Sequence, residues 1–126
     1  MKSDKRRKLF VESPQQVFIQ TPEFLFIGMS HDFSCSTASV RPLPRLIWTV
    51  TDFESRELEL PGDIKTEEEA GGVSSRLTLT PPSSARSLNV HCRAENRVGY
   101  TEDTKTIDLT CNQKNILVSI SLYVQL

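Results

Sequence analysis

The sequence lacks a long hydrophobic run and an excess of charge of either sign. The sequence has 126 residues, and it contains no apolar stretch of the roughly 18 residues that a membrane-spanning helix needs. The basic residues near the start are not followed by the apolar run of a signal peptide. With 15 basic and 16 acidic residues the formal net charge is −1, so no global field favours nucleic acid or an acidic membrane. We therefore expect no nucleic-acid partner and no membrane insertion within this segment.

Residues that build catalytic and metal sites are also scarce. The 2 histidines, His31 and His91, belong to no Cys-x-x-Cys or His-x-x-x-His pattern of the kind that spaces zinc ligands. Nucleophile-elbow and phosphate-loop patterns are absent as well. The run Glu67-Glu68-Glu69 gathers carboxylates without the full ligand set of a calcium site. We therefore expect no enzyme, no metal site and no cofactor, with both histidines in packing or solvated positions.

The length leaves room for one domain, since domains cluster near about 100–150 residues. Residues 1–13 are predicted to be a disordered basic arm because they carry the like-charge run Lys5-Arg6-Arg7-Lys8, which also matches a nuclear-import patch. The domain itself is expected over residues 14–111. Residues 112–126 alternate apolar and polar residues and form a strand-like extension of uncertain status. This extension opens a following domain, adds to a sheet edge, or is a non-native tail.

Period-two alternation of apolar and polar residues recurs along the chain and predicts an all-β fold. A first strand is expected to be split at Pro22, because proline suits edge strands. Glu57–Leu60 alternates and stops at the turn signal Pro61-Gly62, and Lys65–Gly72 is expected to be an exposed loop or a weak edge strand. The two parts of the split first strand cover residues 17–20 and 24–27. Further strands are expected over residues 31–37, 46–51, 76–80, 88–96 and 101–110. The candidate core residues on their inward faces include Trp48, Leu77, Leu79 and Val90.

The most specific pattern is a pair of cysteines with a tryptophan between them. Trp48 follows Cys35 by 13 residues, and Cys92 follows Cys35 by 57. The segments CSTASVRPLPRLIWTVT, from Cys35, and SRLTLTPPSSARSLNVHCRAENRVG, around Cys92, resemble an immunoglobulin-like domain of the C2 or I type. They are similar in style to nephrin-like and nectin-like receptors of cell adhesion and recognition. The resemblance covers about residues 14–110.

That resemblance implies a two-sheet Greek-key sandwich with one inter-sheet disulfide, Cys35–Cys92, against which Trp48 packs. Closing a 57-residue loop is worth on the order of 4 kcal/mol in the chain-entropy model, and it implies an oxidising compartment. Cys111 is left over, either as a free thiol near a fragment end or paired with a cysteine elsewhere. The chain departs from the family pattern at Val90, where a tyrosine often pins the preceding turn.

Function in such domains sits on exposed surfaces. The resemblance implies an extracellular recognition or cell-adhesion module, in the ectodomain of a plasma-membrane protein, that binds another immunoglobulin-like cell-surface protein through a sandwich face or end loops such as Arg41–Arg45. The alternative is a structural spacer in an intracellular immunoglobulin-like array, where the cysteines would stay reduced. The candidate binding residues are the outward ones on the two strands that hold Trp48 and Cys92, namely Ile47, Thr49, His91, Arg93 and Glu95.

Overall fold

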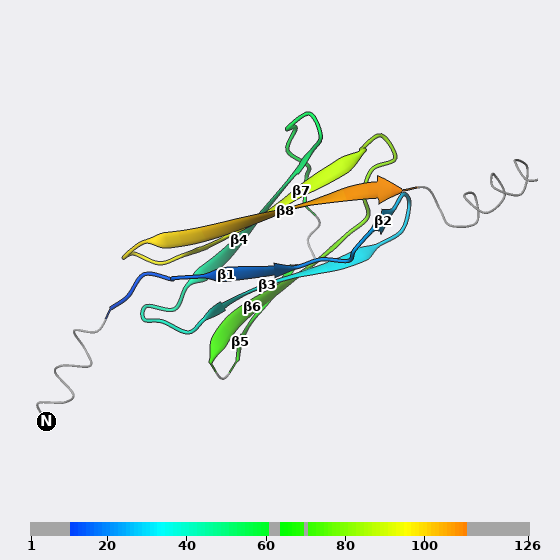
Figure 1. The fold of residues 1–126 in the computed structure, drawn as a ribbon. Helices are drawn as coiled ribbons and strands as arrows, with labels where there is room; N and C mark the ends of the chain where they lie inside the picture. The colour runs from blue at the N-terminus through cyan, green and yellow to red at the C-terminus, as the bar shows by residue number, and fades with distance from the viewer. Residues whose placement is uncertain (1–10, 61–63, 70, 111–126) are drawn as a thin grey trace, which may run out of the picture.

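The protein folds as two face-to-face β-sheets, as Figure 1 shows for this computed structural model. The structure describes residues 11–60, 64–69 and 71–110, and these contain eight strands and no helix. The strands are β1 (Val17–Gln20), β2 (Leu25–Phe26), β3 (His31–Ala38), β4 (Arg45–Asp52), β5 (Ile64–Glu69), β6 (Gly72–Leu79), β7 (Ser87–Glu95) and β8 (Tyr100–Thr110).

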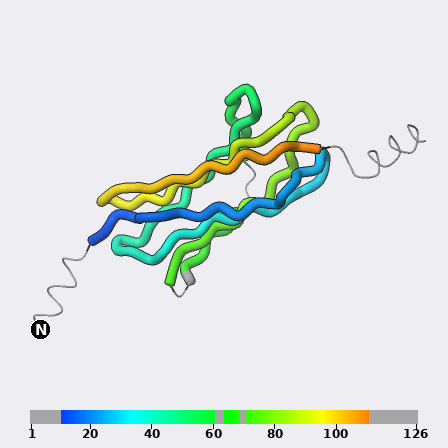
Figure 2. The backbone as a smooth tube through the Cα atoms, viewed as in Figure 1, coloured from blue at the N-terminus to red at the C-terminus, as the bar shows by residue number. Residues whose placement is uncertain are grey.

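The strand order in one sheet is β1-β3-β6-β5 and in the other β2-β8-β7-β4. Chain neighbours therefore cross repeatedly between the layers, and the two layers run side by side in both views (Figures 1 and 2). Pro22 divides the first strand as expected, because β1 pairs with β3 in one sheet whereas β2 pairs in parallel with β8 in the other. This arrangement confirms the predicted all-β sandwich.

The core lies between the sheets and is built from the inward side of each alternating strand. Phe33, Leu77 and Leu88 are each at most 1% exposed, and burial of one such side chain contributes about 1.5–3 kcal/mol. The Cys35–Cys92 disulfide joins β3 to β7 through the centre of this core, as predicted, with the two Cα atoms 6.5 Å apart. The other expected core residues, Trp48, Leu79 and Val90, are also buried.

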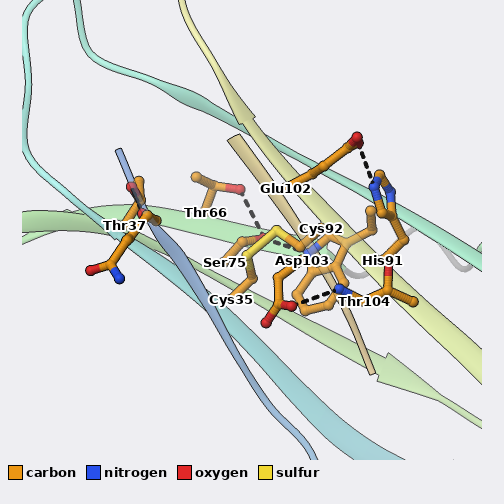
Figure 3. The surroundings of a disulfide bond; sticks show 11 residues. Cys35, Thr37, Thr66, Ser75, His91, Cys92, Glu102, Asp103 and Thr104 are labelled. Carbon is orange, nitrogen blue, oxygen red and sulfur yellow. Dashed lines mark hydrogen bonds and ion pairs between the residues drawn. A yellow bond between two sulfur atoms is a disulfide. The ribbon is translucent and has the colours of Figure 1, made fainter. Parts of the chain in front are cut away.

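A short chain of polar groups accompanies the disulfide (Figure 3). The Trp48 indole Nε1–H donates to the Ser75 hydroxyl at 2.9 Å, and the Thr66 hydroxyl donates to the same oxygen at 3.3 Å. Ser75 is 2% exposed. Because a buried donor without a partner is costly, Ser75 is what allows the indole to lie between the sheets.

The turn before β7 holds its shape without the family's tyrosine. Val90 fills the equivalent inward position and is fully buried. The turn closes instead through its backbone, because the Ala85 amide donates to the Pro82 carbonyl at 3.1 Å and the Leu109 amide donates to the Arg86 carbonyl at 2.9 Å.

Two expectations about the segment between β4 and β6 need correction or refinement. The alternation in Glu57–Leu60 does not form a strand: only the isolated bridge between Thr51 and Glu57 is present. Leu58 and Leu60 alternate because they pack their side chains against the core. Lys65–Gly72 was expected to be a loop or a weak edge strand, and Ile64–Glu69 forms the edge strand β5.

Several expectations fall on residues outside those that the structure describes. These are the turn signal Pro61-Gly62, most of the basic arm over residues 1–13, Cys111, and the strand-like extension over residues 112–126.

Candidate functional site

The five residues expected to bind a partner lie on one outward face, formed by β4, β7 and β8. Ile47 on β4 lies opposite Arg93 on β7, and Thr49 lies opposite His91. Glu95 continues the outward row along β7, two residues beyond Arg93. All five are half-buried. We call this surface, together with the β8 residues that extend it, the β4-β7-β8 face.

Arg93 contacts an aromatic ring on the neighbouring strand. Its guanidinium carbon stands 3.7 Å from the centre of the Tyr100 ring, a close cation–π contact. Its Nε lies 3.0 Å from Glu95 Oε1, yet this buried Nε forms no hydrogen bond, because the ion pair lacks the required angle. Arg45 approaches the other oxygen of Glu95 at 3.9 Å. Ion pairs as exposed as these contribute about 0–1 kcal/mol to the free energy of unfolding. The pair with Glu95 therefore orients Arg93 more than it stabilises the fold.

His91 anchors the middle of the face. Its Nε2 lies 2.7 Å from Glu102 Oε2 on β8, and the pair points away from the disulfide in Figure 3. A carboxylate only accepts hydrogen bonds, so His91 donates through Nε2. This contact ties the His91 ring to β8.

Sequence reasoning did not assign Tyr100 and Glu102 to this face, and it expected Arg45 only as part of the end loop Arg41–Arg45. The sequence signal that could have found Tyr100 and Glu102 is the turn Asn96-Arg97-Val98-Gly99. The Asn96 amide donates to the Gly99 carbonyl and closes this turn, which pairs Glu95 with Tyr100. Counting outward by two from that pair places Glu102 beside Arg93 and Thr104 beside His91. Tyr100 is 54% exposed, which leaves one face of an amphipathic ring available to a partner.

Two surface hollows within the described residues lie elsewhere, on the outer side of the other sheet. One of 380 Å³ is lined by Gln20, Asp32 and Arg76 among others, and one of 350 Å³ by Phe18 and Gly72 among others. Both hollows are shallow and open to solvent, whereas small-molecule sites bury most of the surface of their ligand. We therefore place the candidate site on the β4-β7-β8 face.

Across the residues that the structure describes, no cluster of three or more His, Cys, Asp or Glu side chains is placed to hold a metal ion. Within the same residues no helix has the length and apolar character required to cross a bilayer.

The fold and the face define an immunoglobulin-like domain, a class that typically acts by binding rather than by catalysis. The match to a family model is more specific: residues 11–102 match the CD80-like C2-set immunoglobulin domain. The chain belongs to this family. A comparison with curated proteins found no match.

Comparison with solved structures finds the same fold in several proteins. The mouse nectin-like molecule 4 ectodomain (Ig1–Ig3) matches with a TM-score of 0.56 at 16% identity, over 79% of this chain and 35% of that one. Dpr2 Ig1–Ig2, in complex with DIP-Theta Ig1–Ig3, matches with a TM-score of 0.53 at 18% identity, and the match covers 81% of this chain and 33% of that one. Titin M4 matches with a TM-score of 0.53 at 16% identity, and the match covers 79% of this chain and 98% of that one. This chain thus spans about a third of the nectin-like ectodomain, and identities this low show the fold alone.

Proposed function

We propose that the domain, residues 14–111, is an extracellular recognition or cell-adhesion module that binds another immunoglobulin-like cell-surface protein through the β4-β7-β8 face. The observation that carries this proposal is the preorganised pair of Arg93 and Tyr100 at the hairpin end of that face. Arginine and tyrosine are enriched among the residues that dominate binding energy. A side chain that is already held in place loses less conformational entropy on binding.

The composition of the surrounding face supports a protein partner. Ile47 adds apolar area beside Arg93, while Glu95 and Glu102 supply carboxylates. A mixture of an aromatic ring, a guanidinium, an aliphatic side chain and a polar rim is typical of non-obligate protein interfaces. The structural likeness to Dpr2, which is in complex with DIP-Theta, supports the same kind of partner.

A binding assay with exposure-matched variants tests the proposal. The secreted full chain is immobilised and tested by surface plasmon resonance against itself and a panel of immunoglobulin-like ectodomains. Tyr100→Ser should weaken the interaction about tenfold or more, and His91→Ala should weaken it less. Phe18→Ser is the control, because Phe18 is 55% exposed on the outer side of the other sheet, against 54% for Tyr100. Loss of binding with Phe18→Ser but not Tyr100→Ser would place the interface on the other sheet.

The alternative, a spacer in an intracellular array, is separated by the state of the thiols. In material from a secretory pathway the Cys35–Cys92 bridge leaves one alkylatable cysteine, Cys111. The protein is alkylated once in the folded state and once after denaturation, and the intact mass of each sample gives the number of free thiols. Three alkylated cysteines on the folded chain would overturn an extracellular role and favour the spacer.

A further inference from the structure

The end of the sandwich where the chain enters is held together by one side chain, Asn96. Its Nδ2 donates to the Glu12 carbonyl at 2.7 Å and to the Pro42 carbonyl at 2.9 Å. Its Oδ1 accepts from the Val98 amide at 2.9 Å and from the Gly99 amide at 3.2 Å. Both donors and both lone pairs of the amide are therefore used. Asn96 ties together the entering segment, the β3–β4 loop and the β7–β8 turn.

Two further contacts tighten this assembly. The Glu12 amide donates to the Arg41 carbonyl at 2.9 Å. Gly99 allows the entering segment to lie close to the turn, because a Cβ at that position would come within 2.9 Å of Ser13 Cβ. The three segments meet at the same end of the molecule in Figures 1 and 2. Hydrogen bonds hold this loop cluster together although it contains no regular strand.

Each tied segment exposes one aliphatic side chain beside its bond to Asn96. Val11 precedes Glu12 and is 40% exposed, Leu43 follows Pro42 and is 36% exposed, and Val98 lies in the turn and is 45% exposed. We call these three residues the apical patch. Exposed aliphatic side chains that lie singly need no explanation. Here each of the three lies in a segment that hydrogen-bonds to Asn96, and so the three form a candidate interaction surface.

The exposed charge around the apical patch indicates the charge of the partner that it would bind. Arg41 and Arg97 are exposed in the tied segments and have no ion-pair partner among the described residues; they outnumber the one exposed acid of these segments, Glu12. The acidic Glu67 and Glu68 lie on β5, at the edge of the other sheet farthest from β1.

We propose that the apical patch, with Arg41 and Arg97, is a second binding surface for an acidic protein segment that carries apolar side chains. Opposite charge steers the partner and the aliphatic centre buries its apolar groups. A second copy of this chain is disfavoured as the occupant, because two basic ends would repel each other. Single-stranded nucleic acid is disfavoured because its bases stack on aromatic rings, and the patch is aliphatic. This surface adjoins the hairpin end of the β4-β7-β8 face but uses none of its residues.

Fluorescence anisotropy with the full chain tests this proposal. The probe is a labelled synthetic peptide of alternating leucine and glutamate, and a leucine–lysine peptide serves as the control probe. We expect binding of the acidic peptide alone, weakened by added salt. The Leu43→Ser/Val98→Ser variant should weaken binding about tenfold, whereas Phe53→Ser, which removes a side chain 42% exposed in the β4–β5 connection, should not.

A charge reversal keeps the test decisive if the double variant unfolds. Arg97→Glu should weaken binding several-fold more than Lys105→Glu, an exposed cation on β8 that gives the same change in net charge. His91→Ala, on the β4-β7-β8 face, should leave peptide binding unchanged, which distinguishes failure of this surface from failure of the proposed function. No binding of the acidic peptide, equal effects of the two charge reversals, or preferential binding to phosphatidylserine vesicles would overturn the proposal.

Discussion

The Trp48 indole donates a hydrogen bond of 2.9 Å to the Ser75 hydroxyl across the interior of the sandwich. This bond links β4 in one sheet to β6 in the other and lies beside the Cys35–Cys92 disulfide. It gives the two layers a polar connection in addition to the covalent one.

Ser75→Ala should lower the free energy of unfolding by about 1–3 kcal/mol, because the buried indole N–H would lose its acceptor. Urea denaturation followed by tryptophan fluorescence measures the change. Ser36→Ala is the control, since Ser36 is exposed on the outward side of β3, and it should stay within about 0.5 kcal/mol of wild type. Equal effects of the two variants would show that the indole finds another partner.

Asp52 makes stability depend on acid pH. Its pKa lies below the ordinary aspartate value of 3.8, first because the Arg56 amide donates to its carboxylate, with further bonds from the Glu54 amide and the Arg56 side chain; burial opposes the shift. A lowered folded-state pKa means that the folded state favours the ionised carboxylate. The contribution is therefore complete above the unfolded pKa of about 3.9 and is lost as pH falls through the folded value.

Asp52→Asn should accordingly flatten the fall in melting temperature with pH in the acid range below about pH 4, where the wild type loses the ionised carboxylate. Thermal melts at a series of pH values measure this dependence. Asp108→Asn, a change at an exposed position on β8, is the control and should keep the wild-type profile. An unchanged acid profile in Asp52→Asn would mean that other groups govern acid unfolding.

Ser55 adopts a left-handed backbone, with φ of 64°, in the turn that follows β4. This conformation costs an L-residue about 1–2 kcal/mol, and glycine adopts it freely but loses more backbone entropy on folding. Ser55→Gly should therefore raise stability by a few tenths to about 1 kcal/mol. Ser55→Val should lower it, because a β-branched residue fits this conformation poorly. Chemical denaturation compares them, and the opposite order would refute this account of the turn.

The contact between Arg93 and Tyr100 should be measurable as a coupling energy. A double-mutant cycle with Arg93→Ala and Tyr100→Leu, read by thermal or chemical unfolding, should give about 0.5–1 kcal/mol, the range of exposed cation–π pairs. A parallel cycle with Arg93→Ala and Thr104→Ala is the control, because Thr104 lies opposite His91 rather than Arg93. Zero coupling between Arg93 and Tyr100 would remove the preorganisation on which the proposed interface rests.

Much of this fold could be predicted from local pattern. Alternation marked β3, β4, β6, β7 and β8 and their inward faces, because a period of two assigns a side to every residue of a strand. The same rule failed at Glu57–Leu60, where Leu58 and Leu60 pack on the core from an irregular segment. After the turn at Ser55, two backbone hydrogen bonds connect this segment to β4. The Asp52 amide donates to the Arg56 carbonyl, and the Leu58 amide donates to the Val50 carbonyl.

Local sequence pattern was enough for strands β3, β4, β6, β7 and β8, for their inward residues, and for the half of the β4-β7-β8 face that β4 and β7 supply. Tertiary structure alone decided which distant residues became neighbours. Tyr100 reaches Arg93 through the register of the β7–β8 hairpin, and Ser75 reaches Trp48 through the packing of two sheets. Asn96 gathers three segments that lie up to 84 residues apart. Alternation assigns a side chain to a face, whereas strand register and layer packing assign its neighbours, and a recognition surface depends on those neighbours.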